Sequence, residues 1–141
     1  MHLKLLRLFL GFSAVAWGAS IFGVILSWST ATEALEGLGA RPIAYDRMLD
    51  YWLRMAAGAF TLVGLLYLLL MLQPRKHQNM IPWFGGMMLA EGLVLLVHGL
   101  RLGLPPLPFY ADTAACFVGG AGIWWCWSRI DWSNLSESAV Q

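Results

Sequence analysis

Charged residues are scarce in this sequence of 141 residues. Asp, Glu, Lys and Arg make up only 12% of the chain, against about a quarter in soluble domains. Hydrophobic residues make up 59%, and the mean hydropathy is +0.64. The formal net charge of +1 offers no basic surface that could displace counterions from a nucleic acid. The composition therefore predicts a membrane protein, with the lipid bilayer as its partner and no nucleic-acid partner.

Residues that bind metals or carry out covalent chemistry are also few. Cys116 and Cys126 are ten residues apart in one apolar segment, about 15 Å along a helix. This is too far for a disulfide bond, and the spacing is not that of a CxxC site. His98 is the one histidine within an apolar segment, so neither haem ligation nor a metal site is expected. Without a phosphate-binding glycine loop or a Walker lysine, no cofactor is expected, and a non-catalytic role is favoured over an enzyme.

Four apolar stretches are long enough to cross a bilayer, which takes about 20 helical residues. Short polar or proline-containing turns, QPRKHQN and GLPPLP, separate the second stretch from the third and the third from the fourth. Helices joined by such short turns are usually antiparallel neighbours. We therefore predict an all-α, single-domain, four-helix transmembrane bundle with spans at residues 5–28, 55–72, 80–102 and 109–127.

The connection at residues 29–54 is the longest polar segment between the predicted spans. TATEALEGLGA predicts a short helical turn that ends near its glycines. PIAYDRMLDYWLRM mixes apolar and charged residues in a pattern typical of an amphipathic interfacial helix that continues into the second span. Residues 129–141 form a polar C-terminal tail.

Basic residues predict the orientation, because cytoplasmic loops of membrane proteins are enriched in Lys and Arg. Both termini and the turn between the second and third spans are expected on the cytoplasmic side, since the basic residues there are Lys4, Arg7, Arg75, Lys76 and Arg129. The first stretch also resembles a signal peptide, with HLKLLR before small residues. Its apolar run continues through IFGVILSW, which favours a retained anchor.

Small residues predict how the helices associate, since close backbone approach drives helix packing in lipid. Pairs at four-residue spacing occur in the first and fourth stretches, and glycines recur in the middle two: Ala14 and Gly18, Ala19 and Gly23, Ala115 and Gly119, Gly58, Gly64, Gly85, Gly92 and Gly99. We expect a compact bundle. The same faces also permit a homodimer or a larger membrane complex.

The third span carries three polar residues, Glu91, His98 and Arg101. Seven residues turn a helix through about 700°, so Glu91 and His98 lie within about 20° of one face and about 10 Å apart along the axis. Arg101 lies close to that face. One side of this helix therefore combines an acid, an imidazole and a guanidinium.

Antiparallel packing would bring the outer end of this face level with other polar residues. Arg54 and Asp50 begin the second span, and Tyr110 and Asp112 begin the fourth. We therefore expect a polar cluster at the outer mouth of the bundle, formed either by Arg101 with Asp112 or by Asp50 with Arg54 and His98. Glu91 lies deeper, level with Trp17 and Ser20 of the first span, where no basic residue is expected.

Two interpretations of these polar residues follow. In the structural one, Glu91 bonds to a carbonyl or hydroxyl group, and the outer cluster ties helix ends together. In the functional one, an intramembrane acid marks a site for a lipid-like small molecule, with the candidate residues Glu91, His98, Arg101, Asp112, Arg54 and Tyr110. An accessory subunit without a ligand fits the structural interpretation. The alternatives are a proton-transfer isomerase with Glu91 as its catalytic acid or base, or a quinone-linked redox accessory.

The motifs DYWLRMAAGAF, GLLYLLL and HGLRLGLPP, with four short spans and a basic turn, resemble the small bacterial four-helix membrane proteins of the DoxX-like families. The resemblance covers about residues 50–125. It implies a bacterial inner-membrane protein, and the members tied to thiosulfate and quinone oxidation would imply a redox partner. A second similarity is to sterol-isomerase-like and sigma-2-receptor-like proteins, which also place acids inside a bundle. Neither resemblance assigns a role to a particular residue.

Overall fold

This computed structural model describes residues 1–133 except for the side chain of Pro108. Six helices and their connections form this part of the chain. They are α1 (His2–Gly18), α2 (Ile21–Ile25), α3 (Trp28–Gly37), α4 (Arg47–Leu72), α5 (Ile81–Leu102) and α6 (Pro106–Ser128). No strand occurs within these residues, so the predicted all-α class is confirmed. From residue 134 onward the predicted C-terminal tail lies outside the described residues.

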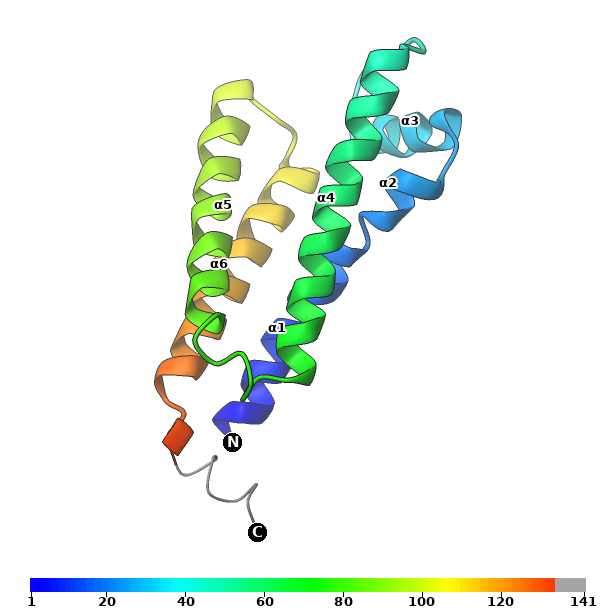
Figure 1. The fold of residues 1–141 in the computed structure, drawn as a ribbon. Helices are drawn as coiled ribbons and strands as arrows, with labels where there is room; N and C mark the ends of the chain where they lie inside the picture. Colours follow the sequence, from blue (N-terminus) through cyan, green and yellow to red (C-terminus); the bar gives the residue numbers. More distant parts are fainter. Residues whose placement is uncertain (134–141) are drawn as a thin grey trace.

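The long helices form two pairs rather than one evenly packed bundle (Figure 1). In one pair α1 and α2 pack along α4, and in the other α5 packs along α6. The pairs meet through α1 and α6 near the N-terminus and separate toward the other end. The expectation that consecutive spans are neighbours thus holds for α5 and α6. It is wrong for most of α4 and α5, which approach each other only near their connecting turn, where the Tyr67 hydroxyl donates to the carbonyl of Phe84 at 3.0 Å.

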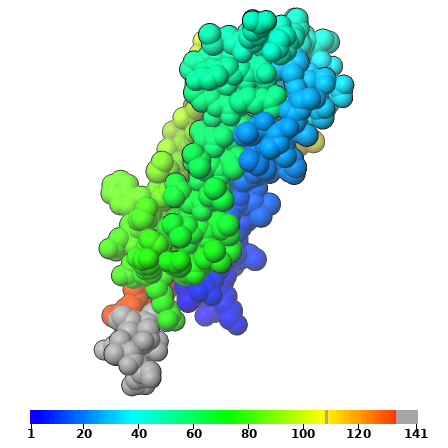
Figure 2. Space-filling model, turned by 45° about the vertical axis from the view of Figure 1, so that its right-hand side comes forward, coloured from blue at the N-terminus to red at the C-terminus, as the bar shows by residue number. Residues whose placement is uncertain are grey.

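Glycines explain why α1 and α2 pack closely against α4. A Cβ atom placed on Gly64 of α4 would lie 2.5 Å from the backbone nitrogen of Gly18, so here the two backbones are in direct contact. One step further along, a Cβ on Gly23 of α2 would lie 2.8 Å from the Cβ of Ala57 on α4. Figure 2 shows the surfaces of α1, α2 and α4 side by side along the molecule. Because close backbone approach stabilises helix pairs in lipid, these contacts draw α4 toward α1 and α2, away from α5.

Glycines likewise explain the second pair. A Cβ on Gly120 of α6 would lie 2.8 Å from the carbonyl oxygen of Gly85 on α5, and Gly92 packs against Cys116. Nearer the α5–α6 turn, the ring of Phe109 lies directly against Gly99. Three contacts along the two helices hold α5 and α6 together over most of their length.

The buried core lies at the end of the molecule where the two pairs meet. Its members come from the first halves of α1 and α5 and the last half of α4, and from α6 between its middle and its end: Leu6, Leu10, Tyr67, Leu70, Ile81, Met88, Cys116, Ile123 and Cys126. Both cysteines are free, as their spacing predicts. The core ends at the level of Met88 and Cys116, where the pairs begin to separate.

Several helix ends differ from the predicted ones. The first apolar stretch is broken at Ala19 and Ser20, so it forms α1 and α2 rather than one helix over residues 5–28. Helix α3 begins at Trp28, because the Ser27 hydroxyl accepts a hydrogen bond from the backbone nitrogen of Thr30.

Helix α4 begins at Arg47, where Asp46 caps the backbone nitrogen of Leu49 at 2.9 Å. The residues after Pro42 are therefore not helical as far as Asp46, and the charged turns that follow belong to one continuous helix of 26 residues. At the start of α6, Leu107 has an extended backbone, as is usual for a residue before proline.

Three helical stretches within the described residues are long and apolar enough to cross a membrane: His2–Ile25, Arg47–Leu72 and Ile81–Leu102. Helix α6 is as long as α5, with 23 residues against 22, but is not among them. Its Asp112, its glycines, its tryptophans and Tyr110 lower its hydropathy. The three apolar helices, and the many leucines exposed on them, indicate an integral membrane protein.

Candidate functional site

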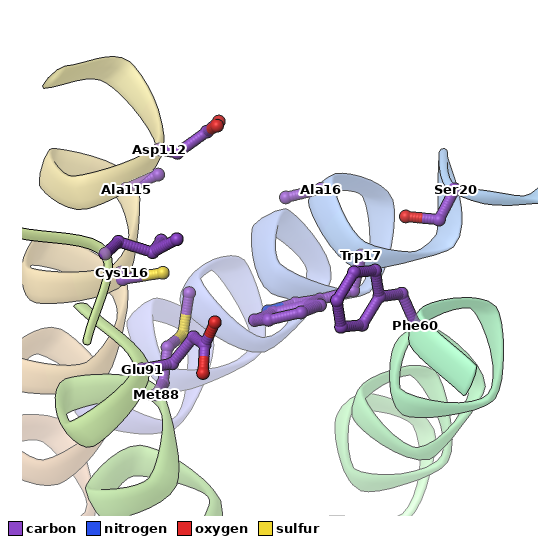
Figure 3. Close-up of a pocket in the computed structure, with 10 residues that line it drawn as sticks. Ala16, Trp17, Ser20, Phe60, Met88, Glu91, Asp112, Ala115 and Cys116 are labelled. Carbon is purple, nitrogen blue, oxygen red and sulfur yellow. The ribbon is translucent and has the colours of Figure 1, made fainter. Parts of the chain in front are cut away.

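A cavity opens where the two helix pairs separate, directly beyond the core (Figure 3). Its volume is about 260 Å³, and all four long helices line it. We call it the Glu91 cavity and define it by Ala16, Trp17, Ser20, Phe60, Met88, Glu91, Leu95, Asp112, Ala115 and Cys116. Met88 and Cys116 also belong to the core, so the cavity begins at the level where close packing ends.

Glu91 lies near the middle of α5, and its carboxyl group extends into the cavity (Figure 3). Met88, Glu91 and Leu95 are three and four residues apart, which places them on one helix face. Among residues 1–133, the Glu91 side chain makes no hydrogen bond and no ion pair. Glu91 is partly buried. Its carboxyl group has no partner within the described residues, as the sequence predicts, and it faces the cavity.

An aromatic wall from α1 and α4 faces Glu91 (Figure 3). The rings of Trp17 and Phe60 meet edge to face, with centroids 5.2 Å apart and planes at 64°. Ser20, at the break between α1 and α2, also lines the cavity, and Figure 3 shows its hydroxyl directed inward. Trp17 and Ser20 thus lie at the depth of Glu91, as the sequence predicts.

A second acid, Asp112 of α6, lines the same cavity. It projects into the gap between the helix pairs on the side away from Met88 (Figure 3). The expected partner, Arg101, forms no ion pair with it within residues 1–133. No basic side chain lines the cavity, so neither acid has a cationic partner within it.

His98, Arg101 and Tyr110 are all exposed, and none of them lines the Glu91 cavity. His98 lies on nearly the same face of α5 as Glu91, but two turns further from the core. The helix pairs are apart at this end of α5 (Figure 1), and the side chain of His98 is exposed. The outer polar cluster expected from Asp50, Arg54 and His98 does not form across the gap.

Arg54 has a different role from the one expected at the mouth of the cavity. Its guanidinium group bonds the Asp50 carboxylate at 3.0 Å and donates to the carbonyls of Gly23, Val24 and Leu26. These carbonyls lie at the C-terminal end of α2, where helical carbonyl groups lack partners of their own. Arg54 therefore fastens α2 to α4 and does not line the Glu91 cavity.

A neighbouring cavity of about 240 Å³ lies between α4 and α5. It shares Trp17, Phe60, Met88 and Glu91 with the first and adds apolar residues such as Tyr67 and Phe84. Glu91 thus borders two adjoining spaces, one lined by a second acid and one almost entirely apolar. Sequence reasoning missed Phe60 and Cys116, because neither their polarity nor their spacing marks them as site residues.

No family of proteins, curated protein or solved structure was found to match this chain. Within residues 1–133, no group of three or more His, Cys, Asp or Glu side chains is arranged to hold a metal ion. The chemistry of the Glu91 cavity is therefore read from its own residues: two carboxyl groups, an indole, a hydroxyl and an apolar wall.

Proposed function

We propose that this protein crosses the bilayer four times and binds a lipid-like molecule in the Glu91 cavity. Helix α6 supplies the fourth span, since it packs along α5 and against α1. After the extended Leu107, residues 108–128 extend about 32 Å as a helix, enough for a hydrocarbon core of about 30 Å. A bilayer that encloses α1 and α5 would enclose α6 with them.

The proposed orientation places the N-terminus, the α4–α5 turn and the end of α6 in the cytoplasm. These segments lie at the same end of the molecule (Figure 1) and carry five basic residues, from Lys4 to Arg129. The bacterial inner membrane is the proposed location, as the resemblance to DoxX-like proteins implies.

The unpartnered carboxyl group of Glu91 is the observation that supports binding. In the structural interpretation, this group would bond to a carbonyl or hydroxyl group, and no such bond is present. Acids within membrane spans are rare and usually face a partner or a cavity. Glu91 faces a cavity.

The lining residues favour a ligand with a positively charged head. Two carboxyl groups would attract an amine, and the indole of Trp17 lines the same cavity. A volume of about 260 Å³ is smaller than most drug-sized pockets, which measure about 300–1,000 Å³, so it suits the head group rather than a whole lipid. The hydrocarbon tail would extend between the helix pairs toward the bilayer. We therefore propose an amphipathic amine as the ligand.

Binding of dodecylamine to the protein in nanodiscs tests this proposal, with dodecanol and dodecanoate as ligands of equal chain length. We expect the amine to bind best and the carboxylate worst. Glu91→Gln should weaken amine binding about tenfold or more, since the loss of one partly buried charge pair costs over 1.4 kcal/mol. The matched control is Glu33→Gln, which removes an exposed acid of α3 and should bind like the wild type.

Two outcomes would overturn the proposal. Equal amine binding by Glu91→Gln and Glu33→Gln, with both variants folded, would place binding elsewhere and favour an accessory subunit. Recovery of a bound hydrophobic molecule as an isomer with a shifted double bond would instead favour the proton-transfer enzyme, with Glu91 as its acid or base.

A further inference from the structure

A second and larger groove runs along the outer face of α1. Its volume is about 940 Å³, and it shares no lining residue with the Glu91 cavity. Gly11 and Ala14 contribute to its lining from α1, Met71 from α4 and Val118 from α6. The lining is almost entirely apolar, except at the end nearest the N-terminus, where Lys4 and Arg7 lie.

The shape of the groove suits an extended hydrocarbon chain. From Lys4 to Val15 it follows α1 for eleven residues, about 16 Å along the axis. This length is close to half of a hydrocarbon core of about 30 Å, the depth of one leaflet. Gly11 lets Met71 of α4 pack closely against α1 at the edge of the groove, since a Cβ atom there would lie 2.9 Å from the sulfur of Met71.

The charge of the groove is confined to one end. Lys4 and Arg7 are three residues apart, so their side chains leave the same face of α1. Both are exposed, neither side chain makes an ion pair or hydrogen bond within residues 1–133, and no acid lines the groove. The charged groups of Lys4 and Arg7 thus lie at one end of the groove, and its apolar end at Val15 is about the depth of one leaflet away.

We propose that this groove binds an anionic phospholipid of the cytoplasmic leaflet. Its phosphate group contacts Lys4 and Arg7, and one acyl chain lies along Leu8 and Phe12 toward Val15. Basic pockets at the cytoplasmic ends of transmembrane helices bind anionic head groups in this way. The stems of the two basic side chains extend along apolar surface and present their charges at head-group depth. The proposal rests on the proposed membrane orientation, with the start of α1 on the cytoplasmic side, but does not depend on ligand binding near Glu91.

Native mass spectrometry of the full chain tests the proposal, after release from nanodiscs of equal phosphatidylglycerol and phosphatidylcholine. We expect the wild type to retain phosphatidylglycerol preferentially. The double variant Lys4→Gln with Arg7→Gln should reduce this preference about tenfold or more. The control, Arg75→Gln with Lys76→Gln, removes two exposed charges at the same end of the molecule but outside the groove, and should keep the preference.

The groove-filling variant Val15→Trp distinguishes a lipid bound in the groove from anionic lipid attracted by positive charge alone. Val15 is 74% exposed, so a larger side chain fits without repacking the core, and the substitution should displace the acyl chain with no change in charge. Equal losses from the two charge variants would overturn the proposal, as would a Val15→Trp variant that binds like the wild type. Displacement of the lipid by free inorganic phosphate would contradict it too, and so would a dimer that excludes lipid.

Discussion

Replacing Gly64 by alanine tests whether direct backbone contact holds α1 and α4 together. The added Cβ atom would lie 2.5 Å from the nitrogen and 2.7 Å from the Cα of Gly18, and 3.0 Å from the carbonyl oxygen of Ala14. All three are backbone atoms, so no side chain can rotate to make room. The helices would have to move apart by about 1 Å to reach ordinary van der Waals distances.

The size of the effect follows from two opposing contributions. Overpacking a close contact typically costs about 1–3 kcal/mol, while replacing glycine by alanine inside a helix gains about 1 kcal/mol from helix propensity. Gly58→Ala is the matched control, because it lies in the same helix and a Cβ atom there meets nothing within 4 Å. The propensity gain is common to both variants. Gly64→Ala should therefore be less stable than Gly58→Ala by about 1–3 kcal/mol.

Reversible unfolding of the two variants in mixed micelles of mild detergent and dodecyl sulfate would measure this difference by circular dichroism. Equal free energies of unfolding for Gly64→Ala and Gly58→Ala would refute the reasoning. The contact between α1 and α4 would then not be the tight crossing that separates α4 from α5.

Three further predictions concern the second helix pair, the Arg54 cap and the topology. Gly120→Ala should be less stable than Gly86→Ala by about 1–3 kcal/mol, since a Cβ on Gly120 would lie 2.8 Å from the Gly85 carbonyl oxygen and one on Gly86 would lie 3.9 Å from Trp124; equal melting temperatures would contradict this. Arg54→Gln should lower the free energy of unfolding by about 2–3 kcal/mol and leave dodecylamine binding unchanged. The control Arg47→Gln, at an exposed residue, should change neither quantity. Weaker amine binding by Arg54→Gln would show that Arg54 contributes to the binding site. Cysteine at Ala40 should react with an impermeant maleimide from outside the cell, and cysteine at His77 only after permeabilisation; the reverse pattern would invert the proposed topology.

The sequence alone predicts the helical content, the approximate bounds of α5 and α6, and the end of α4, because apolar length and turn residues determine them. The glycines at 64, 85, 92 and 99 are also recognisable in advance as packing positions. Their partners are not. Each small residue marks a face of one helix, but only the folded chain shows that Gly64 meets Gly18 and that Gly120 meets Gly85.

The same limit explains which site predictions describe the cavity. Depth along a helix can be counted from the sequence, so Trp17 and Ser20 are correctly placed level with Glu91. The exposure of a side chain cannot be predicted in this way, because it depends on which other helix packs against its face. His98 shares a face with Glu91 yet is exposed, at the end of α5 where the helix pairs are apart (Figure 1). The bonds of Arg54 to the end of α2 depend on that helix ending at Ile25, which the continuous apolar run does not reveal.

The glycine contacts and the Glu91 cavity are linked by geometry. Close contacts within each pair draw α4 toward α1 and α5 toward α6, and the cavity lies where the two pairs part. Gly64 does not line the cavity, but Trp17 and Phe60 project into it from the two helices that Gly64 joins. A shift of about 1 Å between α1 and α4 would therefore move the aromatic wall relative to Glu91, and misplacements of this size commonly weaken a preorganised site. Gly64→Ala should thus reduce dodecylamine binding while Gly58→Ala preserves it. Unchanged binding in a destabilised Gly64→Ala variant would show that the wall does not position the ligand.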